Sequence, residues 1–145
     1  MVPQRIEREI LIDAPVEVVW AVVTEPEHIS GWFSDAVELD LRPGGEAILR
    51  WNDGGTIHAR VEQVEPPRLF SFRWLVRADA GLGADNATLV EFRLASEGDR
   101  TRLTVVESGF ADLALPEEAK QQRFDGHDRG WDHELAQLVE HVGRR

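Results

Sequence analysis

The 145-residue sequence contains no cysteine. Disulfide bonds, thiolate catalysis and cysteine-based zinc sites are therefore excluded. No stretch approaches the roughly 20 consecutive apolar residues of a membrane-spanning helix, and residues 1–5 lack the apolar run of a signal peptide. We therefore expect a cytoplasmic protein that does not insert into a membrane.

The sequence patterns of several enzyme classes are also missing. No serine lies in a G-x-S-x-G setting, and there is no H-E-x-x-H pattern. The glycine pairs at 44–45 and 54–55 are typical of turns between strands, not of phosphate-binding loops. His127-Asp128 and Asp132-His133 could supply metal ligands, but such pairs are usually solvated. We expect no metal and no cofactor.

Positive charge is scarce, and the formal net charge is -11. Such an acidic chain is a poor partner for nucleic acid or for an anionic membrane. Its length suits one domain with a core of its own, and no linker or repeat interrupts it. We expect residues 1–145 to form a single domain.

Near the N-terminus the hydrophobic pattern predicts one strand followed by two short helices. Isoleucines between residues 6 and 12 share one parity, which is typical of a strand with one buried face. Apolar residues at 16, 19, 20 and 23 follow the helical period, so we expect Trp20 to anchor the first helix in the core. Asp13 is a suitable N-cap, and residues 24–27 resemble a capping box for the second helix.

The C-terminal part of the chain predicts an amphipathic helix that ends near Gly143. Its apolar positions recur at helical spacing, and they are Trp131, Leu135, Leu138, Val139 and Val142. Gly126 and Gly130 argue against one unbroken helix from Pro116, because glycine weakens a helix interior.

Between these helices the pattern is that of successive hairpins. Alternation predicts strands over residues 46–51, 56–65, 70–74, 90–94 and 103–107, with turn signals between them. Residues 79–86 form a polar, glycine-containing connection, which is either a plain hairpin loop or the edge of a lid. A run of hairpins flanked by helices indicates an α+β fold.

The order of these motifs resembles the START/Bet v 1-like helix-grip fold and, more narrowly, the activator-of-Hsp90-ATPase homologues. The resemblance spans nearly the whole chain, and its specificity lies in the joint order of short motifs. These are Ala14-Pro15, Val19-Trp20, Thr24-Glu25-Pro26-Glu27-His28, Trp32-Phe33, Pro43-Gly44-Gly45, Pro66-Pro67-Arg68-Leu69 before Phe72 and Trp74, Thr101-Arg102-Leu103, Ser108-Gly109-Phe110 and Gly130-Trp131.

The resemblance implies a curved antiparallel sheet of six or seven strands wrapped around a long C-terminal helix, with two short helices after the first strand. It also implies a cavity between sheet and helix, since relatives of this fold bind lipids, sterols and aromatic polyketides. Stimulation of the Hsp90 ATPase belongs to eukaryotic co-chaperones that carry a further domain. One departure is Glu107, at a position where relatives often have histidine.

Aromatic residues are numerous for one small core. Each aromatic side chain buries on the order of 150–250 Å². Either all of these side chains pack into the core, or some of them line an apolar pocket. The residues that we predict to line a ligand site are Trp32, Phe33, Trp51, Phe70, Phe72, Trp74, Phe92, Glu107, Phe110, Trp131 and Leu135.

Glu107 is the one candidate catalytic residue, because its parity with Leu103 and Val105 points it inward. A buried carboxylate needs a partner. It is paired with an inward arginine such as Arg8 or Arg50, or it lies at a water-filled cavity mouth, or it is a pocket carboxylate that orients a ligand or transfers a proton.

Three functions are consistent with these features. The first is non-enzymatic binding of a small hydrophobic or aromatic ligand between the sheet and the C-terminal helix. The second is a cyclase-like or hydrolase-like enzyme for an aromatic or polyketide-type substrate, which uses Glu107 with Arg50 and His58 as possible partners. The third is a protein–protein adaptor in the manner of the co-chaperones, which needs an exposed apolar patch. The sequence allows a monomer or a homodimer.

Overall fold

The computed structural model describes residues 2–76 and 85–144. In chain order, its elements are β1 (Arg5–Ile12), α1 (Val16–Thr24), α2 (Pro26–Trp32), β2 (Ala36–Leu39), β3 (Glu46–Arg50), β4 (Thr56–Glu65), β5 (Leu69–Leu75), β6 (Ala87–Glu97), β7 (Arg100–Ser108), the 3₁₀ turn η1 (Phe110–Asp112) and α3 (Glu117–Gly143).

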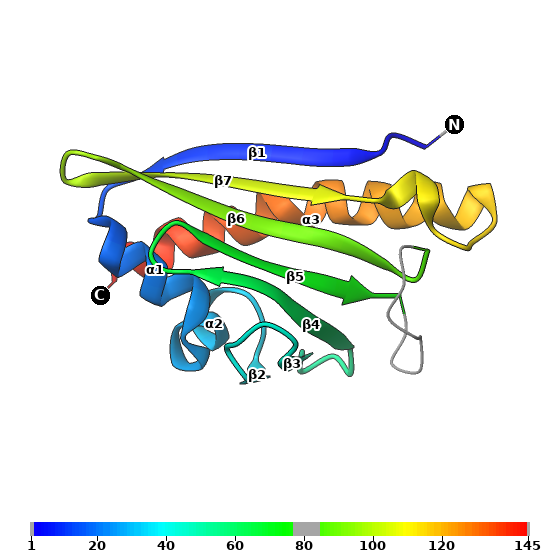
Figure 1. Cartoon of the computed structure of the whole chain (residues 1–145), viewed down its shortest axis with the longest axis horizontal. Coiled ribbons are helices and arrows are strands. Elements are labelled where there is room, and N and C mark those ends of the chain that lie inside the picture. The colour runs from blue at the N-terminus through cyan, green and yellow to red at the C-terminus, as the bar shows by residue number, and fades with distance from the viewer. Residues whose placement is uncertain (1, 77–84, 145) are drawn as a thin grey trace.

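The strands form one antiparallel sheet in the order β1-β7-β6-β5-β4-β3-β2 (Figure 1). Six strands follow one another as hairpins, and β1 closes the far edge by pairing with β7. The register of β4 shifts between Val61 and Gln63, and such a bulge bends a strand. The predicted α+β helix-grip fold with two short helices after the first strand is confirmed.

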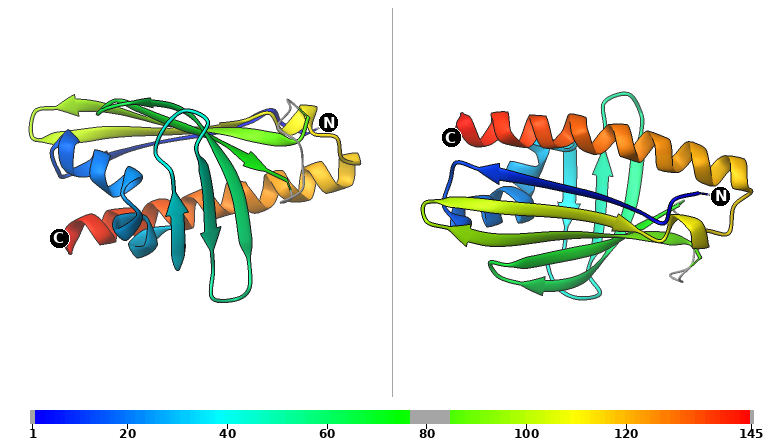
Figure 2. Two further views of the ribbon diagram at one scale, coloured as in Figure 1. Left: turned by 60° about the horizontal axis from the view of Figure 1, so that its bottom comes forward. Right: turned by 90° about the horizontal axis from the view of Figure 1, so that it is seen from above.

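Helix α3 runs along one face of the sheet, and α1 and α2 lie near its C-terminal end (Figure 2). The side chains that α3 buries against the sheet are Trp131, Leu135, Leu138 and Val142. Val139 was expected on this stripe, but it is 48% exposed because its position falls on the outer side of the helix. No helix in the described parts of the chain is long and apolar enough to cross a membrane.

The expectation that Gly126 and Gly130 interrupt this helix is wrong, since α3 is a single helix of 27 residues. A helix interior disfavours each glycine by about 1 kcal/mol relative to alanine. Packing of the apolar side chains against the sheet outweighs this local preference. A Cβ atom at either glycine would meet nothing within 4 Å, so neither is required by close packing.

The predicted side-chain caps of α1 and α2 are also wrong. Neither helix has a side-chain cap hydrogen bond, and the Thr24 hydroxyl instead donates to the carbonyl of Trp20 at 2.7 Å. Pro15 directly precedes α1, and Pro26 occupies the first turn of α2. Proline has the backbone angle of a helix start and no N–H to satisfy, which favours Pro26 at the start of α2.

The predicted core role of Trp20 holds only in part. Trp20 is half-buried against the core, whereas the buried side chains of α1 are Val19, Val22, Val23 and Thr24. Most of the predicted connection at 79–86 lies outside the described residues, which resume at Asp85.

Candidate functional site

The aromatic side chains divide between a closely packed core and an open cavity. In the core, the rings of Phe70, Phe72 and Phe92 lie with their centroids 5.7–6.1 Å apart. Trp32 packs edge-on against Phe92, and its indole N–H donates to the carbonyl of Val22 at 2.9 Å.

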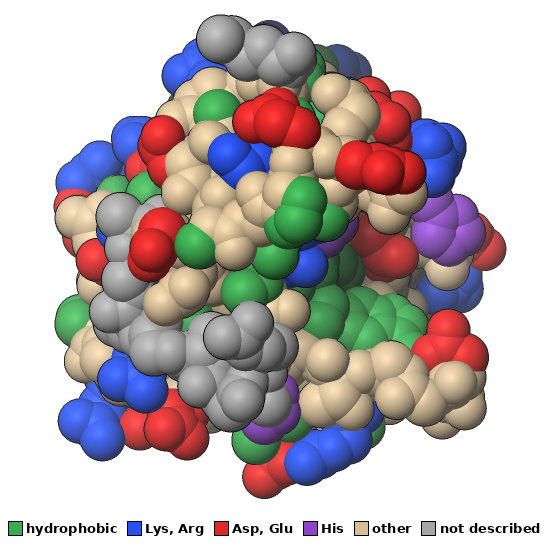
Figure 3. Space-filling view, turned by 90° about the vertical axis from the view of Figure 1, so that its right-hand side faces the viewer, with side chains coloured by type: hydrophobic (Ala, Val, Ile, Leu, Met, Phe, Trp, Pro, Cys, Tyr) green, Lys and Arg blue, Asp and Glu red, His purple; other side chains and the backbone are tan. Residues whose placement is uncertain are grey.

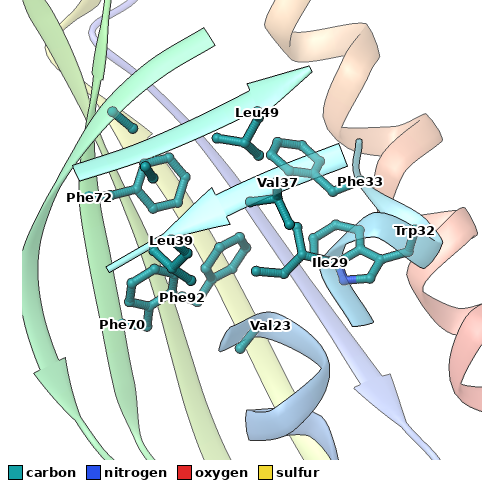
Figure 4. A pocket seen from close by; sticks show the side chains of 12 residues that line it. Val23, Ile29, Trp32, Phe33, Val37, Leu39, Leu49, Phe70, Phe72 and Phe92 are labelled. Carbon is teal, nitrogen blue, oxygen red and sulfur yellow. The ribbon is translucent and has the colours of Figure 1, made fainter. Parts of the chain in front are cut away.

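These rings leave a small cavity between the sheet and α2, in which the apolar side chains point toward one another (Figure 4). Its volume is about 30 Å³. A water molecule needs roughly 10–15 Å³ measured in this way, so the core has no room for an organic ligand. Its lining consists of Val23, Ile29, Trp32, Phe33, Val37, Leu39, Ala47, Leu49, Ala59, Phe70, Phe72 and Phe92.

A larger cavity of about 180 Å³ lies between the β3–β4 turn, the ends of β4 and β5, and helix α3. We call it the aromatic cavity. A hollow with hydrophobic side chains inside it is visible on this side of the molecule (Figure 3). The lining residues are Phe33, Trp51, Ile57, Trp74, Gly126, His127, Gly130, Trp131 and Glu134.

Four rings form the walls of the aromatic cavity. Phe33 is stacked on Trp131, with centroids 5.8 Å apart and planes at 9°. Trp51 and Trp74 meet Phe33 at 77° and 88°, so adjacent walls are nearly perpendicular. The indole N–H of Trp51 donates to the carbonyl of Phe33 at 2.9 Å, which fixes the orientation of the Trp51 ring.

A further cavity of about 170 Å³ adjoins the aromatic cavity on the side of α2. We call it the polar cavity. It shares Phe33, Trp51 and Glu134 with the aromatic cavity, so these three side chains separate the two spaces. The rest of its lining is mainly polar and consists of Ser30, Gly31, Trp32, Ser34, Asp35, His133 and Gln137.

Behind the aromatic cavity lies Glu107, whose side chain is 0% exposed. The Thr88 hydroxyl donates to Oε2 at 2.6 Å, and the indole N–H of Trp131 donates to Oε1 at 2.9 Å. Nδ1 of His127 lies 2.8 Å from Oε2 and 2.9 Å from Oε1. A carboxylate only accepts hydrogen bonds, so Nδ1 of His127 is the donor in this contact when Glu107 is ionised. Three donors thus compensate the cost of burying this carboxylate.

The arginine partners expected for Glu107 are wrong. Arg8 pairs instead with Asp128 and Asp132 on α3, at 2.6 and 2.8 Å. Arg50 is the last residue of β3 and pairs with Glu38 of the edge strand β2 at 2.5 Å. Arg8 and Arg50 side chains are 27% and 49% exposed, so both extend toward solvent and not into the core.

His127 is the side chain that connects Glu107 with the aromatic cavity. Its ring lies against Trp74, with centroids 4.6 Å apart, and Phe110 meets it edge-on at 5.7 Å. Nε2 makes no hydrogen bond to the described residues. The expectation of a solvated His127 is wrong, since its spacing of four residues from Trp131 places both side chains on one face of α3.

One turn earlier on α3, Arg123 is partly buried near Glu107. Its Nε atom has no hydrogen-bond partner within the described residues. Burial lowers the pKa of this guanidinium from its ordinary value, and the charge of Glu107 opposes that shift. Arg123 therefore belongs to the electrostatic environment of the Glu107 network.

Glu134 contrasts with Glu107, because it lines both cavities and makes no hydrogen bond or ion pair with the described residues. Burial raises the pKa of this carboxyl to about 7. A partly desolvated carboxylate without a counter-ion favours its neutral form.

The predicted ligand-lining residues therefore separate into groups. Phe33, Trp51, Trp74 and Trp131 line the aromatic cavity. Trp32, Phe70, Phe72 and Phe92 belong to the packed core around the small cavity, while Phe110, Leu135 and Glu107 line none of the three spaces. The polar residues of the site that were not predicted are His127 and Glu134. The described residues contain no group of three or more potential metal ligands.

A sheet wrapped against a long C-terminal helix, with an aromatic cavity between them, defines a protein of the START/Bet v 1-like helix-grip class. Within this class the chain belongs to the family described as "Activator of Hsp90 ATPase homolog 1-like protein", whose sequence profile matches residues 13–143.

Solved structures share the fold. MLL2253 from Mesorhizobium loti is 23% identical with a TM-score of 0.80, over 97% of this chain and 98% of its own. CalU16 from Micromonospora echinospora is 28% identical with a TM-score of 0.74, over 95% of this chain and 65% of its own. DynU16, a putative protein in the dynemicin biosynthetic locus, is 24% identical with a TM-score of 0.76, over 97% of this chain and 48% of its own. This chain thus spans less than two thirds of the latter two.

A shorter similarity relates the chain to curated proteins. Over 54 residues it is 43% identical to the bifunctional enzyme NanE/NanK of Brucella melitensis biotype 1 and of Brucella suis biovar 1. This match covers 37% of the chain and 10% of that enzyme. The chain therefore spans about a tenth of the length of these curated relatives.

Proposed function

We propose that the protein binds a small aromatic ligand in the aromatic cavity. The observation that carries this proposal is a space of about 180 Å³ whose lining includes the four aromatic side chains of Phe33, Trp51, Trp74 and Trp131. An apolar cavity of about 150 Å³ accommodates benzene. The size therefore favours a ligand of one or two rings over a larger polyketide.

A cavity-filling substitution tests this function. Gly130 lines the aromatic cavity, and a Cβ atom there would meet nothing within 4 Å. Gly130→Leu should therefore fill the space without disturbing α3. Gly143→Leu is the matched control, because Gly143 ends the same helix, lines neither cavity and also has open space.

Isothermal titration with 2-phenylethanol and with indole is the measurement. We expect saturable one-to-one binding to the wild type and to Gly143→Leu, and a loss of at least about tenfold in affinity, or 1.4 kcal/mol, in Gly130→Leu. Failure of both probes to bind the wild type at their solubility limits would refute the proposal.

A second candidate function is proton transfer to or from the bound ligand. It is favoured by the Glu107–His127 pair, in which the carboxylate holds the Nδ1 proton and leaves Nε2 as a base at the cavity wall. His127 would remove a proton from a carbon next to a carbonyl group, and the C–H electrons would form the enolate. Glu107 lies behind His127 and would act as a positioning residue.

Deuterium exchange tests this second candidate. Phenylacetone in D₂O should lose its α-protons faster with the wild type than with buffer, as followed by proton NMR. His127→Gln should remove the acceleration, while His58→Gln should retain it, because His58 lines neither cavity. Equal exchange in the wild type and in His127→Gln would exclude His127 as the base.

No observation favours the adaptor function. Large exposed hydrophobic side chains in the described parts are Leu11, Leu41 and Val139, and they lie on three different segments. Scattered single residues of this kind are normal for a protein surface.

A further inference from the structure

On the basis of the aromatic-ligand function above, we propose that the ligand is a positively charged aromatic amine, with its ring in the aromatic cavity and its ammonium group beside Glu134. Four kinds of observation lead to this class of ligand: the charges that line the two cavities, the position of Glu134, the aromatic side chains of the lining and the charge of the whole chain.

The charges around the two cavities favour a cation. Among the described residues, those that line the aromatic and polar cavities include the acids Glu134 and Asp35 but no lysine or arginine. His127 and His133 are the other titratable groups of this lining. Acidic side chains are visible around the hollow (Figure 3). The net charge of -11 adds a long-range field that concentrates cations at the protein surface.

The position of Glu134 suits an ammonium group attached to a ring by a short chain. Its side chain lies where the aromatic and polar cavities meet, and Phe33 and Trp51 flank the same boundary. A ring held by the four aromatic walls would therefore direct its substituent toward this carboxylate. Glu134 makes no ion pair with the described residues, so the ammonium group of the ligand would be its counter-ion.

The aromatic walls are oriented for a cation as well. The N–H groups of Trp51 and Trp131 are bound to the Phe33 carbonyl and to Glu107, so neither donor is available to an anionic ligand group. The ring faces carry the negative part of the quadrupole and attract ammonium groups, more strongly where the pair is shielded from water. Aromatic walls and a carboxylate thus attract the same kind of ligand.

The test compares three probes that share a phenyl ring and differ in charge. They are 2-phenylethylamine, 2-phenylethanol and 3-phenylpropanoate, titrated calorimetrically at pH 8 against the wild-type protein. We expect the amine to bind about tenfold more tightly than the alcohol, because a hydrogen bond to a charged group is typically worth more than 1.4 kcal/mol. The carboxylate should bind most weakly.

Substitution of Glu134 then tests whether its carboxylate causes the preference for the amine over the alcohol. Glu134→Gln should abolish the difference between amine and alcohol, and Glu134→Asp should retain part of it. Glu118→Gln controls for the lost charge, because Glu118 is exposed on the first turn of the same helix and lines neither cavity. Circular dichroism checks that each variant is folded.

The outcomes separate this inference from the function on which it rests. If neither 2-phenylethanol nor the amine binds the wild type, the aromatic-ligand function itself fails. If the alcohol binds as tightly as the amine, the cavity takes aromatic ligands but the amine proposal is overturned. It is also overturned if Glu134→Gln and Glu118→Gln reduce the preference for the amine equally, since only the overall charge would then matter.

Discussion

Glu107 on β7 and His127 on α3 are joined across the two layers of the fold, with Oε2 of the carboxylate 2.8 Å from Nδ1 of the imidazole. This contact connects β7, the strand next to the β1 edge of the sheet, with the helix that covers the sheet. It also fixes one wall of the aromatic cavity, because Trp131 donates to the same carboxylate. The polar network and the cavity therefore depend on each other.

Replacement of Glu107 by glutamine should destabilise the protein by about 2–4 kcal/mol. The amide has the same shape, but its NH₂ group would face donors from Thr88, His127 or Trp131 and leave one buried partner unsatisfied. Urea unfolding at pH 7 measures the loss. Glu118→Gln removes an equal charge from the surface of α3 and should leave the midpoint within experimental error. An unchanged midpoint in Glu107→Gln would show that the network contributes no stability.

Substitution of a glycine in α3 should stabilise the protein, in contrast with substitution of Glu107. Alanine at Gly126 should stabilise the protein by about 0.5–1 kcal/mol, because it restores helix propensity and reduces the entropy of the unfolded chain. The added Cβ meets nothing within 4 Å. Thermal unfolding should show a higher midpoint. Gly45→Ala is the contrasting control, since its Cβ would lie 2.0 Å from the carbonyl oxygen of Asp40, and this variant should unfold earlier.

The fold could be predicted from sequence because its signals are local. The alternation over β4 and the spacing of Trp131, Leu135 and Leu138 on α3 both depend on neighbours within one element. The effect of Gly126 and Gly130 could not be predicted for the same reason, since the packing that stabilises α3 is not local.

The site could be predicted only where the alternation of side chains along one strand was sufficient to show which residues point inward. The alternation of side chains along β7 was enough to predict that Glu107 points inward. Its partners Thr88, His127 and Trp131 lie 19, 20 and 24 residues away in sequence and come from a different strand and a helix. Which of them reach the carboxylate depends on how far α3 stands from the sheet, and no local pattern encodes that distance. Glu134 was missed for the same reason, because its burial arises from walls supplied by other segments.

The raised pKa of Glu134, about 7, predicts how stability changes with pH. Because the folded state holds this proton more tightly than the unfolded chain, stability falls as the pH rises from about 4.5 through 7. Glu134→Gln should remove this loss. After allowance for solvent screening of a half-exposed group, we expect the variant to gain about 1 kcal/mol over the wild type at pH 8 and almost nothing at pH 5.

Urea unfolding of Glu134→Gln, Glu118→Gln and the wild type at both pH values measures this difference. A gain of equal size at pH 5 and pH 8 would mean that ionisation of Glu134 is not its cause. A gain of equal size in Glu118→Gln would assign it to net charge.

The contact between His28 on α2 and His141 on α3 predicts a loss of stability as the pH falls, which is opposite to the effect of Glu134. Nδ1 of His28 lies 3.0 Å from Nε2 of His141, and burial, followed by the charges of His28 and Arg144, lowers the pKa of His141 below its ordinary value. The unfolded chain therefore takes up this proton at a higher pH than the folded protein does. Stability contributed by the neutral form of His141 is present above its ordinary pKa of about 6.5 and declines as the pH falls below it.

His141→Gln should flatten this acid-side decline, since it removes the group that must stay neutral. His133→Gln is the matched control, because His133 is an exposed histidine of the same helix. Urea midpoints at intervals from pH 7.5 to pH 5 give the slope for each protein. A slope in His141→Gln as steep as in the wild type would show that other groups, and not this contact between α2 and α3, cause the decline.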